Sequence, residues 1–182
     1  MVRTGIAGEH SRIIFEGTAR TRARVDDATS LAYGAAVGDY TQSYSTEISS
    51  SVDDCFKVLV DFEAYPQWSS PVRECTVIDR HPDGLARRVE FKLDMTIKTI
   101  RYVLEYAYEA PTGARWRLVE GDVRAVEGTY HFESHGDRTT ATCTQSIDLG
   151  FWIPGFVRRS FEQRALRESV EEFRKAVEQR RA

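Results

Sequence analysis

Tyrosine and tryptophan recur at alternate positions of apolar segments in this sequence, where leucine, isoleucine or valine would fill a core equally well. A buried tyrosine needs a partner for its hydroxyl, so several on an inward face suit a cavity where they meet water or ligand oxygens. Gln145 shares the parity of Cys143 and Ile147 and would add an inward amide for a ligand carbonyl. The candidate ligand-binding residues are Trp68, Phe91, Met95, Tyr102, Tyr106, Trp116, Tyr130, Gln145 and Phe156.

A plainer interpretation of these residues remains open. The rings would then simply fill the interior of a curved sheet, and Trp68 would be an ordinary core residue at a chain reversal. Gln145 would be a core amide whose hydrogen bonds go to the backbone.

Catalytic side chains are harder to find. His10 lies in the N-terminal segment, His81 and His135 lie in predicted turns, and His131 is expected to face solvent because Tyr130 and Phe132 claim the apolar face. An unperturbed tyrosine has a pKa near 10 and needs a nearby base to act at neutral pH. No inward carboxylate or histidine pairs clearly with the tyrosines, so we assign no catalytic residue.

Composition excludes several classes of protein. The net charge of −3 argues against nucleic-acid binding. No phosphate-binding loop or metal-ligand cluster occurs, so we expect no metal and no cofactor. The three cysteines are widely spaced and suit free, buried thiols in a reducing compartment. No run of about eighteen apolar residues indicates a membrane span. We therefore expect a cytoplasmic protein, either a monomer or a homodimer.

The first elements that would position these residues are one strand and two helices. "TQSYSTEIS" alternates as a strand does. Ser51 then suits a helix N-cap, with Asp53 and Asp54 in the first turn. Pro66 breaks this helix, so "AYPQW" is predicted to form a short second helical turn at an angle to the first.

Six further antiparallel strands are predicted after these helices. The apolar positions are odd-numbered in "LARRVEFKLDM" and even-numbered in "IRYVLEYAY", which indicates a turn between Thr96 and Thr99. The turns "HPDG", "APTG" and "HGDR" separate other strands.

A long helix is predicted after "WIPG", with an apolar stripe and a solvated charged face that carries Arg164–Glu168, Arg167–Glu171 and Glu171–Lys175 pairs. The stripe is Phe156, Val157, Phe161, Ala165, Leu166, Val170, Phe173 and Val177. One helix covers only a narrow strip, so the sheet must curl around it and leave an elongated apolar space.

Residues 1–38 differ from the rest, because no sustained periodicity runs through them. We expect a flexible N-terminal tail there, or residues upstream of the true start codon, and a ligand-binding domain over residues 39–182.

This order of elements, with "ISSSVDDCFKVLVDFEAYPQWSSPVRECTVIDR" and the terminal "GFVRRSFEQRALRESVEEFRKAVE", resembles the START-like (SRPBCC, helix-grip) superfamily. The resemblance covers about residues 41–180 and is greatest to the polyketide cyclase/dehydrase and coenzyme-Q-binding branch. It implies an α+β helix-grip fold of order β-α-α-β6-α. It also implies a cavity between sheet and long helix, closed at one end by the two short helices.

The resemblance leaves three functions open. We favour a non-catalytic binder or carrier of a hydrophobic small molecule such as a lipid, an isoprenoid quinone or a polyketide. The alternative is an aromatic polyketide cyclase/dehydratase that uses Tyr102, Tyr106 or Tyr130. A third option, an interaction module that binds a large assembly such as the ribosome, suits the weakly acidic charge poorly.

Overall fold

The computed structural model describes residues 41–95, 98–150 and 155–181, and for residues 155–163 and 181 only the backbone. The expected tail, residues 1–38, lies outside these ranges. So do the side chains of Phe156, Val157 and Phe161.

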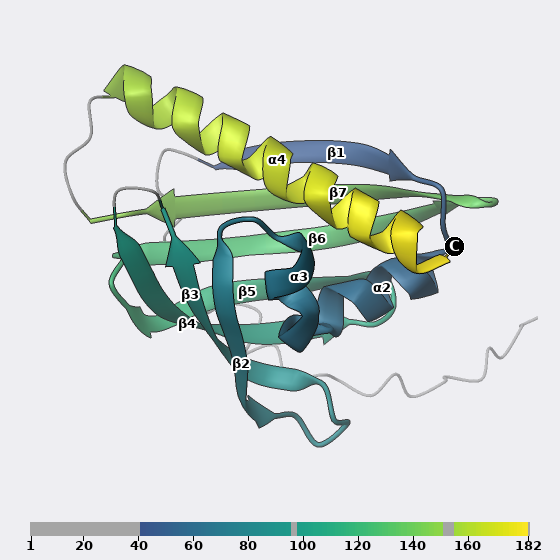
Figure 1. Ribbon diagram of the computed structural model, residues 1–182. Helices are drawn as coiled ribbons and strands as arrows, with labels where there is room; N and C mark the ends of the chain where they lie inside the picture. The colour runs from purple at the N-terminus through teal and green to yellow at the C-terminus, as the bar shows by residue number, and fades with distance from the viewer. Residues whose placement is uncertain (1–40, 96–97, 151–154, 182) are drawn as a thin grey trace, which may run out of the picture. The chain divides into compact units, whose positions relative to one another are not determined.

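A seven-stranded antiparallel sheet forms most of the fold, in the order β1-β7-β6-β5-β4-β3-β2 (Figure 1). The strands are β1 (Gln42–Ile48), β2 (Val72–Arg80), β3 (Ala86–Asp94), β4 (Thr99–Glu109), β5 (Gly113–Gly121), β6 (Ala125–His135) and β7 (Arg138–Asp148). The helical elements are α2 (Val52–Val60), the 3-10 turn η1 (Phe62–Ala64), α3 (Tyr65–Trp68) and α4 (Gly155–Arg181). The predicted helix-grip order is confirmed.

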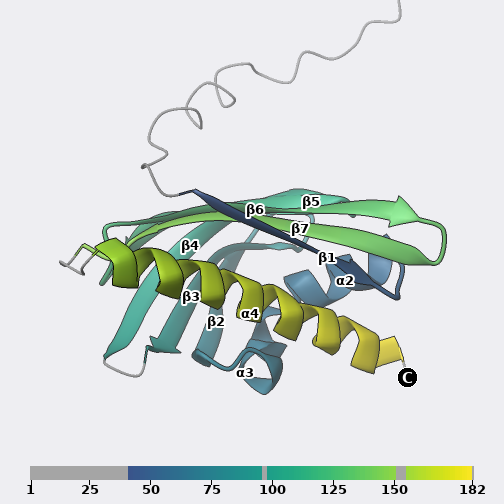
Figure 2. The same ribbon diagram turned by 90° about the horizontal axis from the view of Figure 1, so that it is seen from above.

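The sheet curls around α4. In Figure 2, β2, β3 and β4 turn away from the plane of the other strands, and α4 runs along the concave side. The helix contacts β1, β7, α2 and α3. The two short helices close one end of the space between sheet and α4 (Figure 1).

Local sequence signals explain the helical segment after β1. Ser51 is the N-cap of α2, and its hydroxyl accepts a hydrogen bond from the Asp54 N–H at 3.2 Å. Asp53 and Asp54 add negative charge in the first turn, which favours helix initiation. Pro66 lies in the first turn of α3, where its missing N–H costs nothing. The predicted cap and the short second helix are therefore confirmed, but α2 ends at Val60, so Pro66 lies at the start of α3 and does not break α2.

The predicted switch of the apolar positions, from odd-numbered residues in β3 to even-numbered residues in β4, is also present. Val89 pairs with Leu104 and Phe91 with Tyr102 across the two strands. The Met95 N–H donates to the Lys98 carbonyl at 3.1 Å across the connection, of which residues 96 and 97 are outside the description. Both strands thus turn their apolar faces toward α4.

Among the described side chains of α4, the predicted apolar stripe is wrong at one position. Leu166, Val170, Phe173 and Val177 are buried, whereas Ala165 is exposed. Arg164 pairs with Glu168 as expected, at 2.8 Å.

Glu171 has other partners than the predicted Arg167 and Lys175. It accepts hydrogen bonds from Arg174 at 2.9 Å, from Tyr44 at 3.0 Å and from Thr46 at 2.9 Å. These partners result from tertiary packing, because β1 lies beside this face of α4 and brings two hydroxyls within reach. None of the described helices is long and apolar enough to span a membrane.

Candidate ligand-binding cavity

A cavity of about 820 Å³ lies between the concave sheet and α4. This volume is in the range of pockets that bind small molecules. The side chains of β3, β4 and β5 form one wall, β6 and β7 form another, and α3 and α4 complete it. Eight of the nine candidate residues line it: Trp68, Phe91, Met95, Tyr102, Tyr106, Trp116, Tyr130 and Gln145. Phe156 belongs to the first turn of α4, whose side chains lie outside the description.

One row of directly opposed residues crosses the sheet beneath this cavity. From β1 to β4 the row is Gln42, Gln145, Gly128, Trp116 and Tyr106. A Cβ on Gly128 would lie 2.5 Å from Cζ2 of Trp116, so the indole covers the glycine closely. The row therefore carries two amides at its β1–β7 end and the Trp116 and Tyr106 rings, tilted by 37° to each other, at its other end.

The tyrosine hydroxyls around the cavity differ in their partners. Tyr65 donates to the Leu59 carbonyl at 2.7 Å. Tyr130 lies opposite Cys143 in the register of β6 and β7, and its phenol interacts with that thiol. Tyr102 and Tyr106 line the cavity, and the hydroxyl of neither has a hydrogen bond within the described part of the chain.

Burial determines the charge state of these phenols and thiols. Desolvation raises the pKa of Tyr65, Tyr102, Tyr106 and Tyr130 above the ordinary value of 10. It also raises the pKa of Cys143 to about 12. At neutral pH the cavity wall therefore presents neutral hydrogen-bond donors rather than a thiolate or phenolate.

Helix α3 closes one end of the cavity through packed rings. Tyr65 and Trp68 lie 4.5 Å apart between ring centroids, and Trp68 packs at 6.0 Å against Phe173 of α4. The "AYPQW" stretch therefore forms a wall that joins the short helices to the long one.

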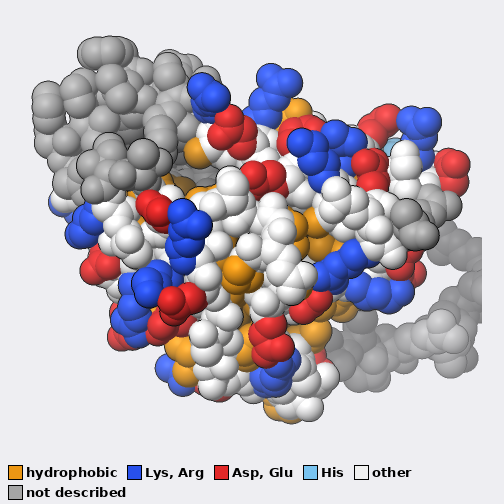
Figure 3. All heavy atoms as spheres, in the orientation of Figure 1, with side chains coloured by type: hydrophobic (Ala, Val, Ile, Leu, Met, Phe, Trp, Pro, Cys, Tyr) orange, Lys and Arg blue, Asp and Glu red, His pale blue; other side chains and the backbone are white. Residues whose placement is uncertain are grey.

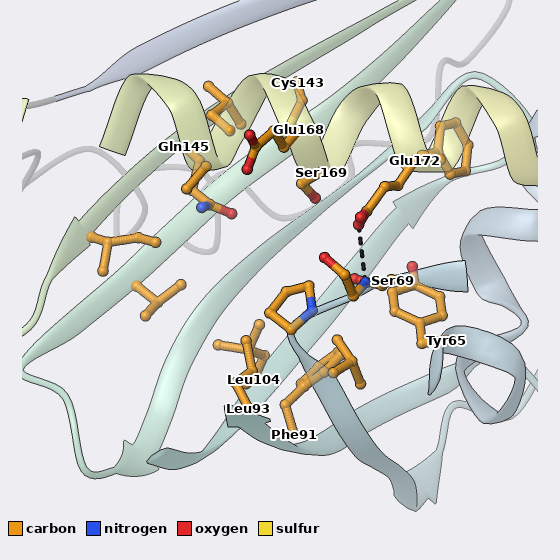
Figure 4. Close-up of a pocket in the computed structure, with 18 of the residues that line it drawn as sticks. Tyr65, Ser69, Phe91, Leu93, Leu104, Cys143, Gln145, Glu168, Ser169 and Glu172 are labelled. Atoms are coloured by element: carbon orange, nitrogen blue, oxygen red, sulfur yellow. Dashed lines mark hydrogen bonds between the residues drawn. The ribbon is translucent and has the colours of Figure 1, made fainter. Parts of the chain in front are cut away.

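The mouth of the cavity is polar. In Figure 4, Glu172 extends from α4 to the α3–β2 connection, whereas Glu168 and Ser169 lie further along the helix. A Glu172 carboxylate oxygen accepts the Ser70 N–H at 3.0 Å across the opening. Arg73 pairs with Asp94 at 2.8 Å, where the start of β2 lies beside the end of β3. Figure 3 shows hydrophobic side chains in the middle of this face, with acidic and basic side chains around them.

The histidines of the described chain lie apart from the cavity lining. His131 is 55% exposed and lies 3.4 Å from Glu133, which matches its predicted outward position. His81 is hydrogen-bonded to the backbone carbonyl of Tyr106 at 2.9 Å, not to a side chain that lines the cavity. No group of three potential ligands that suits a metal ion occurs among the described residues.

Sequence reasoning misses the polar rim and one amide. Ser69, Ser70, Glu168, Glu172 and Gln42 all line the cavity, although the sequence predicts only a solvated role for the charged face of α4. Of these five residues, only Gln42 is predictable from local sequence, because the alternation of β1 places its side chain on the inward face.

A curled antiparallel sheet around a C-terminal helix, with an apolar cavity between the two, defines a helix-grip protein. The chain belongs to the family described as polyketide cyclase / dehydrase and lipid transport, whose model matches residues 48–174. No curated protein matches the sequence. The resemblance to the START-like superfamily is confirmed.

Solved structures share the fold at low sequence identity. A START superfamily protein from Mycobacterium smegmatis is 21% identical with a TM-score of 0.71, over 76% of this chain and 97% of that one. A protein from Thermus thermophilus is 24% identical with a TM-score of 0.66, over 78% and 96%. The Zhui aromatase/cyclase from a Streptomyces species is 14% identical with a TM-score of 0.68, over 79% and 96%.

Proposed function

We propose that the protein binds or carries a hydrophobic small molecule, such as a lipid, an isoprenoid quinone or a polyketide, in the cavity between sheet and α4. The observation that carries this proposal is the space of about 820 Å³ lined largely by rings and aliphatic side chains. Burial of apolar ligand surface there is worth about 25 cal/mol per Å². The polar side chains at the mouth would either hold the hydrated end of a ligand or let the ligand pass into the cavity.

Native mass spectrometry of protein purified from its own host tests this proposal. We expect a co-purifying hydrophobic molecule that organic extraction releases. Binding of a lipophilic fluorescent dye, displaced by host lipid extract, should give the same stoichiometry of one. Absence of both dye and lipid binding would contradict the proposal.

A matched pair of variants ties the binding to the cavity. Ile147 lines the cavity, whereas its neighbour Ser146 points to the other face of β7. Ile147→Trp should fill the space and abolish dye binding, while Ser146→Trp should leave it intact. Equal effects of both variants would place the dye elsewhere.

An aromatic polyketide cyclase/dehydratase is the second candidate. The family description and the tyrosines of the cavity favour it. Because burial raises their pKa, these phenols would act as proton donors rather than bases at neutral pH. Turnover of a poly-keto substrate that Tyr→Phe substitutions abolish would support this function, and stoichiometric binding without turnover would support the carrier.

We also propose that residues 39–182 are sufficient for this function. The family match begins at residue 48, and all of the described cavity lining lies within residues 42–173. Removal of residues 1–38 should leave dye affinity unchanged. A loss of affinity in the shortened but folded chain would contradict this division.

A further inference from the structure

Two phenols in the cavity wall, those of Tyr102 and Tyr106, have no hydrogen-bond partner among the described residues. Tyr106 is only 5% exposed, and Tyr102, on the same strand, is partly buried. By contrast, the phenol of nearby Tyr108 points away from the lining and donates to the Ala86 carbonyl at 2.6 Å. Neither hydroxyl is among the buried polar atoms that lack a partner, so both are accessible from the cavity and can donate a hydrogen bond to a molecule inside it.

The two phenols belong to one aromatic wall. They lie four residues apart on the same face of β4, about 13 Å along the strand at roughly 3.3 Å per residue. The Tyr102 ring lies 5.8 Å from Phe91, and the Tyr106 ring lies 6.0 Å from Trp116 and 4.7 Å from Phe62. A ligand on this wall would meet the apolar faces and edges of tilted rings, with a donor at each of two points.

Fixed charge in the described lining is confined to the mouth of the cavity. The charged side chains among the described lining residues are Arg73, Asp94, Arg164, Glu168 and Glu172. Both arginines are already paired, Arg73 with Asp94 and Arg164 with Glu168. A carboxylate carried inward to the phenols would lose its hydration without gaining a cation, which is strongly unfavourable.

We propose that the ligand is an uncharged molecule with a carbonyl or ether oxygen that accepts a hydrogen bond from Tyr106, with Tyr102 as a second donor along the same wall. This inference rests on the proposed binding function and narrows its ligand class. Ketones, quinones and esters are accepted, and a free fatty acid is disfavoured because its carboxylate has no partner at the phenols.

Three probes of equal chain length test the inference: a long-chain methyl ketone, the corresponding fatty acid and the corresponding alkene, each titrated at neutral pH. The ketone should bind the unaltered protein about tenfold more tightly than the acid, or more, because the acid must lose its hydration. Tyr106→Phe should weaken ketone binding about fivefold, the value of one ordinary hydrogen bond, and leave the alkene unchanged. Tyr108→Phe is the control and should change neither affinity.

An infrared measurement identifies the hydrogen bond directly. The ¹³C-labelled carbonyl of the bound ketone should absorb at lower frequency than in an apolar solvent, and Tyr106→Phe should reverse that shift. Equal binding of acid and ketone, or a carbonyl band unaltered in both Tyr106→Phe and Tyr102→Phe, would overturn the inference while the binding function stands. If none of the three probes binds, the proposed function itself fails and this inference with it.

Discussion

The indole of Trp116 on β5 packs against the backbone of Gly128 on β6, so close that a Cβ there would be 2.5 Å from the ring. No other residue type leaves room for the ring in this position. The pair sets the floor of the cavity, because the ring can lie against the sheet only while residue 128 lacks a side chain.

Gly128→Ala should therefore push the indole into the cavity and also strain β7, because the new Cβ would lie 2.7 Å from the Thr144 backbone oxygen. We expect a loss of stability of about 1–3 kcal/mol, as for overpacked interiors, together with weaker binding of a lipophilic dye. Denaturant unfolding and dye titration measure the two effects. Thr129→Ala, on the exposed face of the same strand, is the control. A dye affinity equal in both variants would show that the ring does not shape the binding space.

Trp116→Ala should reduce ligand binding while the protein still folds. The ring is 6% exposed, and truncation of buried aromatic residues costs about 3–5 kcal/mol. We expect the lower end of that range, since one face of the ring borders the cavity rather than packed atoms. Circular dichroism reports the fold and titration reports binding. Unchanged affinity would remove Trp116 from the binding surface.

Glu172 joins α4 to the α3–β2 connection across the mouth, through the Ser70 N–H at 3.0 Å. Glu172→Ala should free that connection, so ligand association and dissociation should both accelerate. Hydrogen exchange at the Ser70 amide should accelerate as well. Glu168→Ala is the matched control, because Glu168 pairs with Arg164 on its own helix. Identical exchange rates in the two variants would contradict a closing role for Glu172.

Glu171 makes the attachment of α4 to β1 depend on pH. Burial alone would raise its pKa, but hydrogen bonds from Arg174, Thr46 and Tyr44 outweigh that effect and hold the pKa below its ordinary value. A carboxylate with a lowered pKa stabilises the folded state above its ordinary pKa, and this contribution is lost as pH falls through the lowered value.

Glu171→Gln should thus reduce the melting temperature at neutral pH, and the difference from the unaltered protein should shrink as the pH falls below about 4.5. Glu168→Gln, at a side chain exposed to 58%, is the control. A difference that stays constant across the acid range would contradict the assignment.

Much of the fold is predictable from local patterns. The Ser51 cap, the short helix at Pro66 and the parity change between Val89 and Tyr102 are properties of short segments, and each is present. The partners of the charged face of α4 are harder to predict, because Glu171 accepts hydrogen bonds from the hydroxyls of Tyr44 and Thr46, 127 and 125 residues away in sequence. Ala165 likewise follows the stripe in sequence but is exposed.

The residues that line the cavity can be predicted from the sequence only where strand alternation determines which face of the sheet they occupy. Tyr102, Tyr106 and Trp116 follow from parity alone. The role of Gly128 requires the register between β5 and β6, which no local pattern encodes. The contact of Glu172 with Ser70 depends in the same way on how α4 crosses the end of β2.

Trp68 and Trp116 both line the cavity. Indole emission depends strongly on the polarity around the ring, so occupancy of the cavity should be readable as a change in intrinsic fluorescence, with no label attached. Quinones quench such emission by energy or electron transfer, whereas saturated lipids do not. Intrinsic fluorescence should therefore distinguish a quinone from a saturated lipid bound in this cavity.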